Sequence, residues 1–266
     1  MRRRYVDGPA GQIHLRELPG GDAGRPLLIC LHPAPSSGLY FSTLMPLLAA
    51  AGRGVAAPDY PGYGGSDPPP APATIADYAA AAGAVADALS PEAPVDLMGF
   101  HSGCLVAVEA ALAQPARVRR LVLIDAPYFE APARPALRER MGAPKALSWE
   151  LAETLDEVWA FNVANRRDDL PLARAYALFA EQARAGEAMN AAFHAAFSYP
   201  CEEKFAALSA PCTIIATRSG LLEPTRKAAA ALSRARLVER LDVERAVMEI
   251  GAEAMASEIG AALDGQ

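Results

Sequence analysis

The decapeptide VDLMGFHSGC, at positions 95–104, constrains the fold more than any other part of the chain. Its first residues form an apolar run that is typical of a buried strand, and the alanine-rich stretch after it favours a helix. The residues between them predict a tight turn that joins the two elements. At such a turn the strand and the helix cross closely, so the positions two before and two after the apex must be small.

The apex of this turn can be assigned by size. With His101 at the apex, the two small positions are Gly99 and Gly103. With Ser102 at the apex, the first of them would be the bulky Phe100. Histidine also tolerates a positive φ better than most side chains do. The sequence therefore predicts that His101 is the apex residue.

Composition excludes several classes of protein. The 266 residues suffice for one domain with a substantial core, and a hydrophobic share of 52% indicates a globular chain. The net charge of -6 and the pI of about 5.3 offer no basic face for a nucleic acid. No apolar run is long enough for a signal peptide or a membrane span. We expect a cytoplasmic protein with no nucleic-acid partner and no membrane association.

The four cysteines, Cys30, Cys104, Cys201 and Cys212, lack the spacing of metal ligands. Cys30 and Cys212 lie in apolar runs and are expected in the core, with all thiols reduced. No Gly-x-Gly-x-x-Gly motif follows a predicted strand. The sequence therefore predicts neither a metal nor another cofactor.

Short apolar runs alternate with helical segments along most of the chain. Strands are predicted at Gln12–Leu18, Leu27–Leu31, Val55–Ala57, Val95–Met98, Leu121–Ile124 and Pro211–Thr217. Helices are predicted at Tyr40–Ala51, from Thr74 or Asp77 through Ala88, and at Gly103–Gln114. This alternation is typical of an α/β fold, a mainly parallel sheet flanked by helices. We assign residues 1–127 and 209–266 to this core.

Residues 128–208 interrupt the alternation with a helical pattern and are predicted to form an inserted cap. This segment carries most of the large aromatic residues: Trp149, Trp159, Phe161, Tyr176, Phe179, Phe193, Phe197 and Tyr199. Most of them are expected to form the core of the cap itself, and a few to face a ligand cavity.

Four segments, in this order and spacing, carry a resemblance to a known family. They are LHPAPSSG, APDYPGYGGSD, VDLMGFHSGCLVAVEAALAQP and ARVRRLVLIDAP. Together they resemble the His-Gly-x-Pro loop, the Asp-x-x-Gly-x-Gly-x-Ser loop, the nucleophile elbow with its helix, and the strand that leads into the cap of the α/β-hydrolase superfamily. The resemblance covers nearly the whole chain and implies the α/β-hydrolase fold.

The family's catalytic triad of Ser, acid and His is the part of the pattern from which this chain departs. The resemblance aligns His101 with the nucleophile and Ser219 with the acid, with Glu223 nearby but beyond the usual place. It aligns Arg245 with the base, and no histidine follows His194. A serine-type triad in the usual arrangement is therefore excluded.

The resemblance also implies the surroundings of the apex. The backbone N–H groups of Ala34 and Ser102 correspond to the oxyanion donors, since Pro33 and Pro35 have no N–H. His32 is expected to organise its loop through hydrogen bonds to backbone. The Ser102 side chain is expected to cap the helix that follows.

His101 can act as a general acid or base near neutral pH, with Asp125 at the end of the next strand as the nearest carboxylate partner. Three interpretations stay open. The first is an enzyme that uses His101 for hydrolysis or lyase-type cleavage of a small, largely apolar substrate. The second is a ligand-binding pseudoenzyme, and the third is an esterase that uses Ser102 with an unusual base such as His194. The sequence leaves the oligomeric state open.

Overall fold

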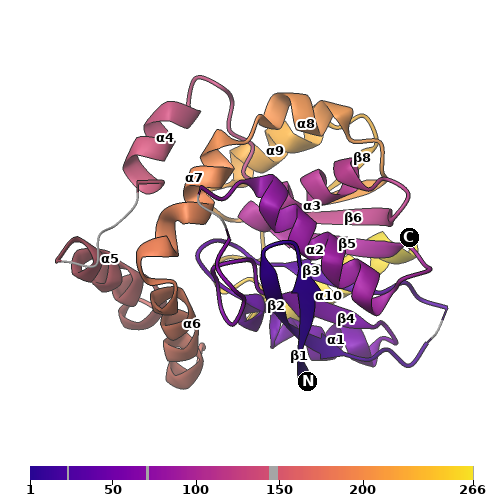
Figure 1. Ribbon diagram of the computed structural model, residues 1–266, viewed down its shortest axis with the longest axis horizontal. Helices are drawn as coiled ribbons and strands as arrows, with labels where there is room; N and C mark the ends of the chain where they lie inside the picture. The colour runs from indigo at the N-terminus through magenta and orange to yellow at the C-terminus, as the bar shows by residue number, and fades with distance from the viewer. Residues whose placement is uncertain (23, 70–71, 144–148, 266) are drawn as a thin grey trace.

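The computed structural model describes residues 1–22, 24–69, 72–143 and 149–265. In this part of the chain a single sheet of eight strands has the order β1-β2-β4-β3-β5-β6-β7-β8, with helices on both sides (Figure 1). The strands are β1 (Arg2–Gly8), β2 (Gly11–Leu18), β3 (Leu28–Leu31), β4 (Val55–Pro58), β5 (Val95–Phe100), β6 (Val118–Ile124), β7 (Cys212–Thr217) and β8 (Ala235–Arg240). The pairs β1–β2 and β2–β4 are antiparallel, and β4, β3 and β5–β8 pair in parallel. The predicted fold class is confirmed.

Helices fill the connections between the strands. They are α1 (Leu44–Ala50), α2 (Ile75–Leu89), α3 (Ser102–Ala113), α4 (Arg134–Met141), α5 (Trp149–Trp159), α6 (Leu172–Arg184), α7 (Ala191–Ser198), α8 (Cys201–Ala207), α9 (Leu222–Ala231) and α10 (Ala252–Asp264). Short turns of other helix types are η1 (Gly38–Phe41), η2 (Ala160–Ala164) and η3 (Gly186–Asn190). Thr74 caps α2 and exchanges hydrogen bonds with Asp77, so the two residues predicted at this helix start act together.

The six predicted strands are present, and the sequence analysis missed β1 and β8. Both missed strands lie at the edges of the sheet, where few side chains need to be buried. Only Val6 of β1 is buried, and β8 has no fully buried residue. An edge strand with so many polar residues lacks the apolar pattern that identifies a central strand.

Two hydrophobic layers cover the sheet. Along β3, Ile29 and Leu31 face a layer that includes α2, α3 and α9, whereas Leu28 and Cys30 face α1 and α10. Consecutive residues of a strand point to opposite faces, so a fully buried strand reads as a continuous apolar run. All four cysteines are buried and free, and Cys30 and Cys212 lie in the core as predicted.

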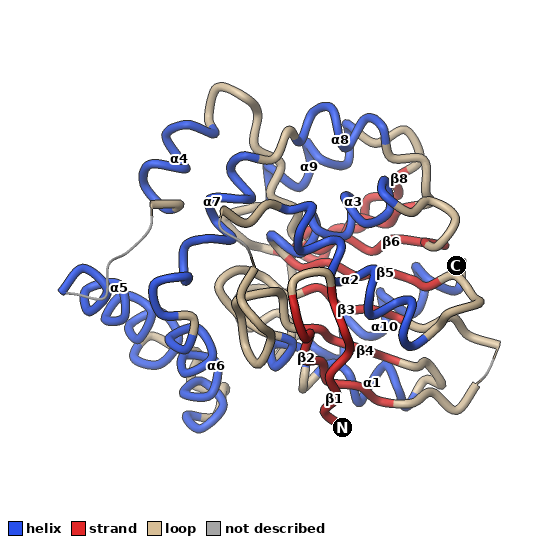
Figure 2. Tube along the Cα trace, viewed as in Figure 1, coloured by secondary structure: helices blue, strands red, loops and turns tan. Residues whose placement is uncertain are grey.

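The helices between β6 and β7 form the segment predicted as a cap. Figures 1 and 2 show α4, α5 and α6 standing away from the sheet beyond the ends of its central strands. Helix α4 packs on α7, and α5 packs with α6 and η2. Helix α8 packs instead against α3 and α9, so it lies with the helices of the core. In the described part of the chain, no helix has the length and apolar character needed to cross a membrane.

Asp59, in the loop after β4, joins several loops near the candidate site. Its buried carboxylate accepts hydrogen bonds from the backbone N–H groups of Gly38 and Gly65, each at 2.8 Å. It also bonds His14 Nδ1 at 2.7 Å and Arg16 Nη1 at 3.2 Å. Burial alone would raise the pKa of Asp59, but the hydrogen bonds from His14 and Gly65 outweigh it and the pKa is lowered.

Replacing this carboxylate is expected to be costly. Asp59→Asn should lower the free energy of unfolding by about 3 kcal/mol, because it leaves the buried Arg16 without its charge partner. Asp87→Asn is the control, since Asp87 is exposed and forms an ion pair with Arg117 that is worth at most about 1 kcal/mol. Urea unfolding at pH 7 measures both variants. Equal losses in the two would contradict this account of Asp59.

Because the folded pKa of Asp59 is depressed, its stabilising contribution is present above the unfolded value and is lost as the pH falls through the folded value. The difference between wild type and Asp59→Asn should therefore shrink below about pH 4. A difference that grows on acidification would contradict the assignment.

Candidate active site

The strand–helix turn after β5 places His101 at its apex. His101 has φ 49° and ψ -123°, a backbone conformation that side chains rarely adopt. A Cβ added at Gly99 would lie 2.4 Å from the carbonyl oxygen of Gly103, and one added at Gly103 would lie 2.1 Å from that of Leu31. Neither position has room for a side chain, so the crossing of β5, β3 and α3 requires both glycines.

His101 faces a cavity of about 560 Å³ between the core and the segment that joins β6 to β7. Both the core and the segment between β6 and β7 contribute residues to the walls of the cavity. The lining residues are Pro33, Ala34, Tyr40, Phe100, His101, Asp125, Phe161, Asn162, Arg166, Arg167, Leu170, Leu178, Gln182, Arg218, Ser219, Gly220, Arg245, Ala246, Val247 and Glu249. The volume suits a small molecule.

The imidazole of His101 lies close to one buried carboxylate. Its Nε2 is 3.9 Å from Oδ2 of Asp125, a distance of electrostatic contact and too long for a hydrogen bond. The imidazole stacks at a tilt on Phe100, with ring centroids 4.0 Å apart. Desolvation within the cleft lowers the pKa of His101, and the Asp125 charge opposes this only in part. The ring is therefore neutral at pH 7.

Asp125 is held by the neighbouring strand. Its carboxylate is fully buried and accepts hydrogen bonds from the Thr217 N–H at 2.8 Å and the Thr217 hydroxyl at 2.6 Å. Asp125 itself has a positive φ of 51°. These bonds hold the carboxylate at the ends of β6 and β7, so that one oxygen faces the His101 ring across 3.9 Å.

His32 organises its loop and does not line the cavity. The ring is fully buried, bonds the carbonyl of Pro33 through Nδ1 at 3.0 Å, and accepts from the Tyr60 N–H at Nε2 at 3.1 Å. It also stacks on Tyr60 with centroids 3.8 Å apart. Burial lowers the pKa of His32 to about 4, so the ring is neutral at pH 7. These contacts are those expected of a loop-organising residue.

The Ser102 hydroxyl does not cap α3, contrary to the prediction. Ser102 is the first residue of that helix, and its Oγ accepts a hydrogen bond of 2.7 Å from the Ala34 N–H. The donor that the sequence analysis assigned to an oxyanion is thus occupied by a hydroxyl in this state. Ala34 and Ser102 are 68 positions apart, so no local sequence pattern predicts this bond.

The other two positions aligned with a catalytic triad also face this cavity. Ser219 and Arg245 line it together with His101, although they come from different loops of the core. Glu223 does not line it; this residue lies on α9 and forms an ion pair with Arg226. The fold therefore brings the three residues that align with the triad, His101, Ser219 and Arg245, to the same cavity.

The sequence analysis missed most of the cationic groups of the cavity. Arg166, Arg167, Arg218 and Arg245 all line it, whereas the predicted substrate was largely apolar. Arg166 and Arg167 follow η2, and the other two follow β7 and β8. No sequence pattern indicated this group of arginines, because residues 166 and 245 are far apart along the chain and come to the same cavity only in the folded molecule.

Hydrogen bonds tie the core to the segment between β6 and β7 around this cavity. Arg174 of α6 bonds Glu249 through Nε at 3.0 Å and Nη2 at 2.6 Å. Ser37 donates to Glu181 of the same helix. Arg245 donates to the carbonyl of Asn165 at 2.5 Å. These bonds fix α6 and η2 over the loops of the core.

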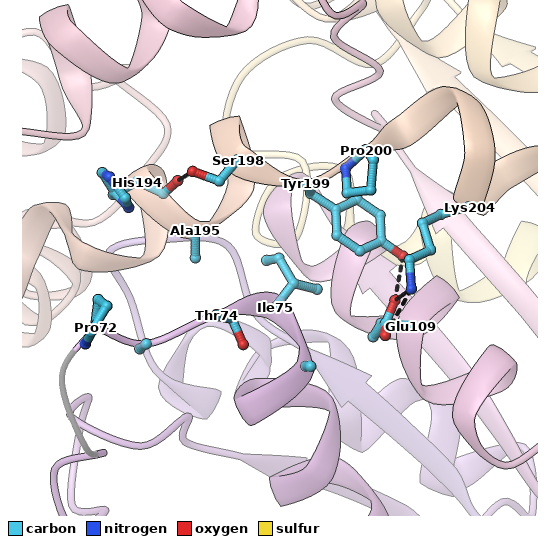
Figure 3. Close-up of a pocket in the computed structure, with 12 residues that line it drawn as sticks. Pro72, Thr74, Ile75, Glu109, His194, Ala195, Ser198, Tyr199, Pro200 and Lys204 are labelled. Carbon is cyan, nitrogen blue, oxygen red and sulfur yellow. Dashed lines mark hydrogen bonds and ion pairs between the residues drawn. The ribbon is translucent and has the colours of Figure 1, made fainter.

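A second cavity, of about 260 Å³, lies between α2, α3 and the α7–α8 region. Figure 3 shows that Glu109 receives hydrogen bonds from Tyr199 and Lys204 there, at 2.9 and 3.1 Å. The exposed His194 lines this second cavity and not the one that His101 lines. The structure therefore does not bring His194 and Ser102 together in one cavity, as the third interpretation requires.

The aromatic residues predicted in the cap have different environments. Phe197 and Tyr199 are buried, whereas Trp159 and Tyr176 are exposed by 41% and 55%. Phe161 lines the His101 cavity. Phe179 and Phe193 are partly buried, and the side chain of Trp149 lies outside the described residues. Among the described residues, no three His, Cys, Asp or Glu side chains gather closely enough to hold a metal ion.

Comparisons with known proteins agree with this architecture. The profile of the alpha/beta hydrolase fold family matches residues 26–183, which is more than half of the chain. The chain therefore belongs to the α/β-hydrolase fold family.

Individual relatives are epoxide hydrolases and other hydrolases. The chain is 31% identical to epoxide hydrolase A of Mycobacterium tuberculosis over 144 residues, 52% of this chain and 44% of that protein. It thus spans less than half the length of this curated relative. Two crystal structures superpose over nearly the whole of both chains. They are epoxide hydrolase A of Mycobacterium thermoresistibile (21% identity, 99% and 98% covered, TM-score 0.81) and a hydrolase of Pseudomonas aeruginosa (22% identity, 100% and 99% covered, TM-score 0.79).

The crossing at the turn predicts a sharp difference between two glycine substitutions. Gly103→Ala should lower the free energy of unfolding by at least 1–3 kcal/mol, roughly the cost of overpacking, because its Cβ meets backbone that cannot move aside. Gly260→Ala should raise it by roughly 0.5–1 kcal/mol, because this position in α10 is open. Chemical denaturation measures both. A Gly103→Ala variant as stable as wild type would contradict the steric account.

Proposed function

We propose that the protein is a small-molecule hydrolase in which the neutral imidazole of His101 acts as general base on a water molecule. His101 takes the place that the family's nucleophile occupies. The observation that carries this proposal is the position of the ring: it stands at a strained turn, faces a 560 Å³ cavity, and has a pKa lowered enough to keep it unprotonated at pH 7. Residues 128–208 act as the cap that closes this cavity.

The proposed step moves one proton and forms one bond. One nitrogen of His101 accepts a proton from water, and the water oxygen bonds to an electrophilic carbon of the substrate. The bond between that carbon and its leaving oxygen breaks, and the oxygen takes the electron pair and then the proton from the imidazolium. Asp125 favours an Nε2–H that points toward it, which leaves Nδ1 as the acceptor.

Asp125 acts on the imidazole by charge. When His101 gains a proton, the buried carboxylate 3.9 Å away stabilises the imidazolium. Asp125 does not itself attack the substrate in this proposal, since Thr217 occupies both of its oxygens with hydrogen bonds. The name of the relative at 31% identity supports an epoxide as the electrophile.

A substrate panel tests this proposal, and it consists of small esters, lactones and epoxides with and without a carboxylate. His101→Gln should reduce turnover of an accepted substrate by roughly 10²–10⁴-fold, the range for loss of a general base. His194→Gln is the matched control and should leave turnover unchanged, because His194 lines the other cavity. Turnover that survives His101→Gln would contradict the proposal.

Isotope labelling distinguishes direct attack by water from attack by a carboxylate of the protein. In a single turnover in H₂¹⁸O, the product should carry the label, because the incoming oxygen comes from solvent. An unlabelled first-turnover product would show that a protein oxygen, such as that of Asp125, had been transferred instead.

The pH profile of kcat/KM should reflect the lowered pKa of His101. The neutral imidazole is the active form, so kcat/KM should stay level from pH 7 to about pH 5 and fall around pH 4, where His101 takes up a proton. Stopped assays across this range measure it. A fall centred near 6.5, the ordinary value for histidine, would contradict a desolvated base.

A ligand-binding protein without turnover is the second candidate, and the Ser102–Ala34 hydrogen bond favours it. This bond occupies an N–H that an oxyanion would otherwise use. Absence of turnover on the whole panel, together with saturable binding in the cavity, would favour this second candidate.

A serine esterase is the third interpretation, and covalent labelling tests it directly. A fluorophosphonate reagent should leave the intact mass of the protein unchanged. The reason is that Ser102 Oγ accepts a hydrogen bond from Ala34, and Ser102 is not among the residues that line either the His101 cavity or the His194 cavity. An adduct that Ser102→Ala abolishes would restore the esterase interpretation.

A further inference from the structure

We infer that the His101 cavity binds an organic anion, whose carboxylate or phosphate group contacts the arginines and whose apolar part packs near His101. This inference rests on the proposed function, since it names the substrate class for the same cavity. It replaces the expectation of a largely apolar ligand. The whole chain has a net charge of -6, so a cationic lining is a local feature and does not follow from the composition.

The charges of the lining are not balanced by carboxylates. Arg167 is paired with Asp169 through two hydrogen bonds of 2.9 and 2.8 Å. Of the two carboxylates in the lining, Glu249 is paired with Arg174, which lies outside the lining, and Asp125 faces the imidazole. Three lining arginines remain without a carboxylate partner among the described residues: Arg166, Arg218 and Arg245.

Two of these three guanidinium groups are fixed in place by backbone oxygens. Arg166 donates to the carbonyls of Leu170 at 3.1 Å and Val163 at 3.3 Å. Arg245 donates to the carbonyl of Asn165 and lies 5.9 Å from the centre of the Phe161 ring. Carbonyl oxygens and an aromatic face orient a guanidinium without neutralising its charge. Both groups keep further N–H donors for a ligand.

Arg218 has no side-chain partner among the described residues. It follows β7 directly, and its backbone N–H is bonded to the carbonyl of Val243 at 2.9 Å, which anchors its Cα at the cavity wall. All five N–H donors of its guanidinium are thus available to a ligand. A planar guanidinium binds carboxylate or phosphate through two parallel hydrogen bonds.

The remaining walls of the cavity indicate an apolar body. Tyr40, Phe100, Leu178 and Val247 line it, and the ring of Phe100 stacks on that of Tyr40 beside His101. Core and cap both contribute an arginine, so an anion that contacts Arg218 and Arg166 bridges the two parts. Binding of such a ligand would place its apolar body against the walls near His101.

Isothermal titration with defined probes tests this inference. The probes are 3-phenylpropionate, the neutral 3-phenylpropanamide, and phenyl phosphate. The acid should bind at least tenfold more tightly than the amide, and its affinity should fall as salt is added. Binding of phenyl phosphate in place of the carboxylate would also support the inference and would identify the anion as a phosphate.

Arg218→Gln is the decisive variant, because no described contact of the fold depends on this side chain. It should weaken binding of the anion roughly ten- to hundred-fold, as expected for the loss of a charge-assisted pair. Arg3→Gln removes the same charge from exposed β1 and should leave affinity unchanged. Arg218→Lys should restore part of the affinity, since it keeps the charge and loses the planar fork.

Three results would overturn the inference: equal binding of acid and amide, no binding of either anion, or anion binding that Arg218→Gln does not weaken. Binding is measured without turnover, so this outcome is independent of the chemistry. If anions bind through Arg218 but His101→Gln keeps full turnover, the general-base proposal fails and anion binding stands. If turnover requires His101 but is indifferent to anionic groups, the reverse holds.

Discussion

The close crossing of strand and helix at Gly99 and Gly103 is the constraint on which the site depends. Backbone approaches both glycines so closely that the turn between them cannot relax, and His101 is held at φ 49°. Strain of this kind persists only where the surrounding structure fixes it. Here the parallel strands on either side and the buried Asp125–Thr217 hydrogen bonds fix it. The result is that the backbone fixes where His101 stands, while Phe100 and Asp125 lie against its imidazole.

The sequence was informative where the physical cause is local. The small residues around the apex, the capping pair Thr74 and Asp77, and the apolar runs of the central strands all act over a few positions, and the structure contains each of them. The edge strands β1 and β8 were missed because each pairs with a neighbour along one side only. Most of their side chains are exposed or half-buried, so their sequences show little apolar pattern.

The chemistry of the cavity depends on contacts between distant parts of the chain, which explains why less of it could be predicted. The alignment of Ser219 and Arg245 with His101 placed three residues correctly at one cavity, because family spacing encodes the order of the loops. No comparable spacing connects Arg166 with Arg218. The bond between Ser102 and Ala34 likewise depends on where two loops meet, and so the expected helix cap was wrong.

Desolvation lowers the pKa of His101 and makes it a weak base, and an anionic ligand would change this. A base with a pKa far below the working pH binds a proton too weakly to be efficient. A carboxylate or phosphate that enters the same cavity brings a negative charge, which stabilises the imidazolium and raises the pKa of His101 toward its ordinary value. Anion binding and base strength would then be coupled: the ligand that the arginines select also strengthens the base that acts on it. A neutral substrate of the same shape would leave the pKa of His101 low, so the base that acts on it would stay weak.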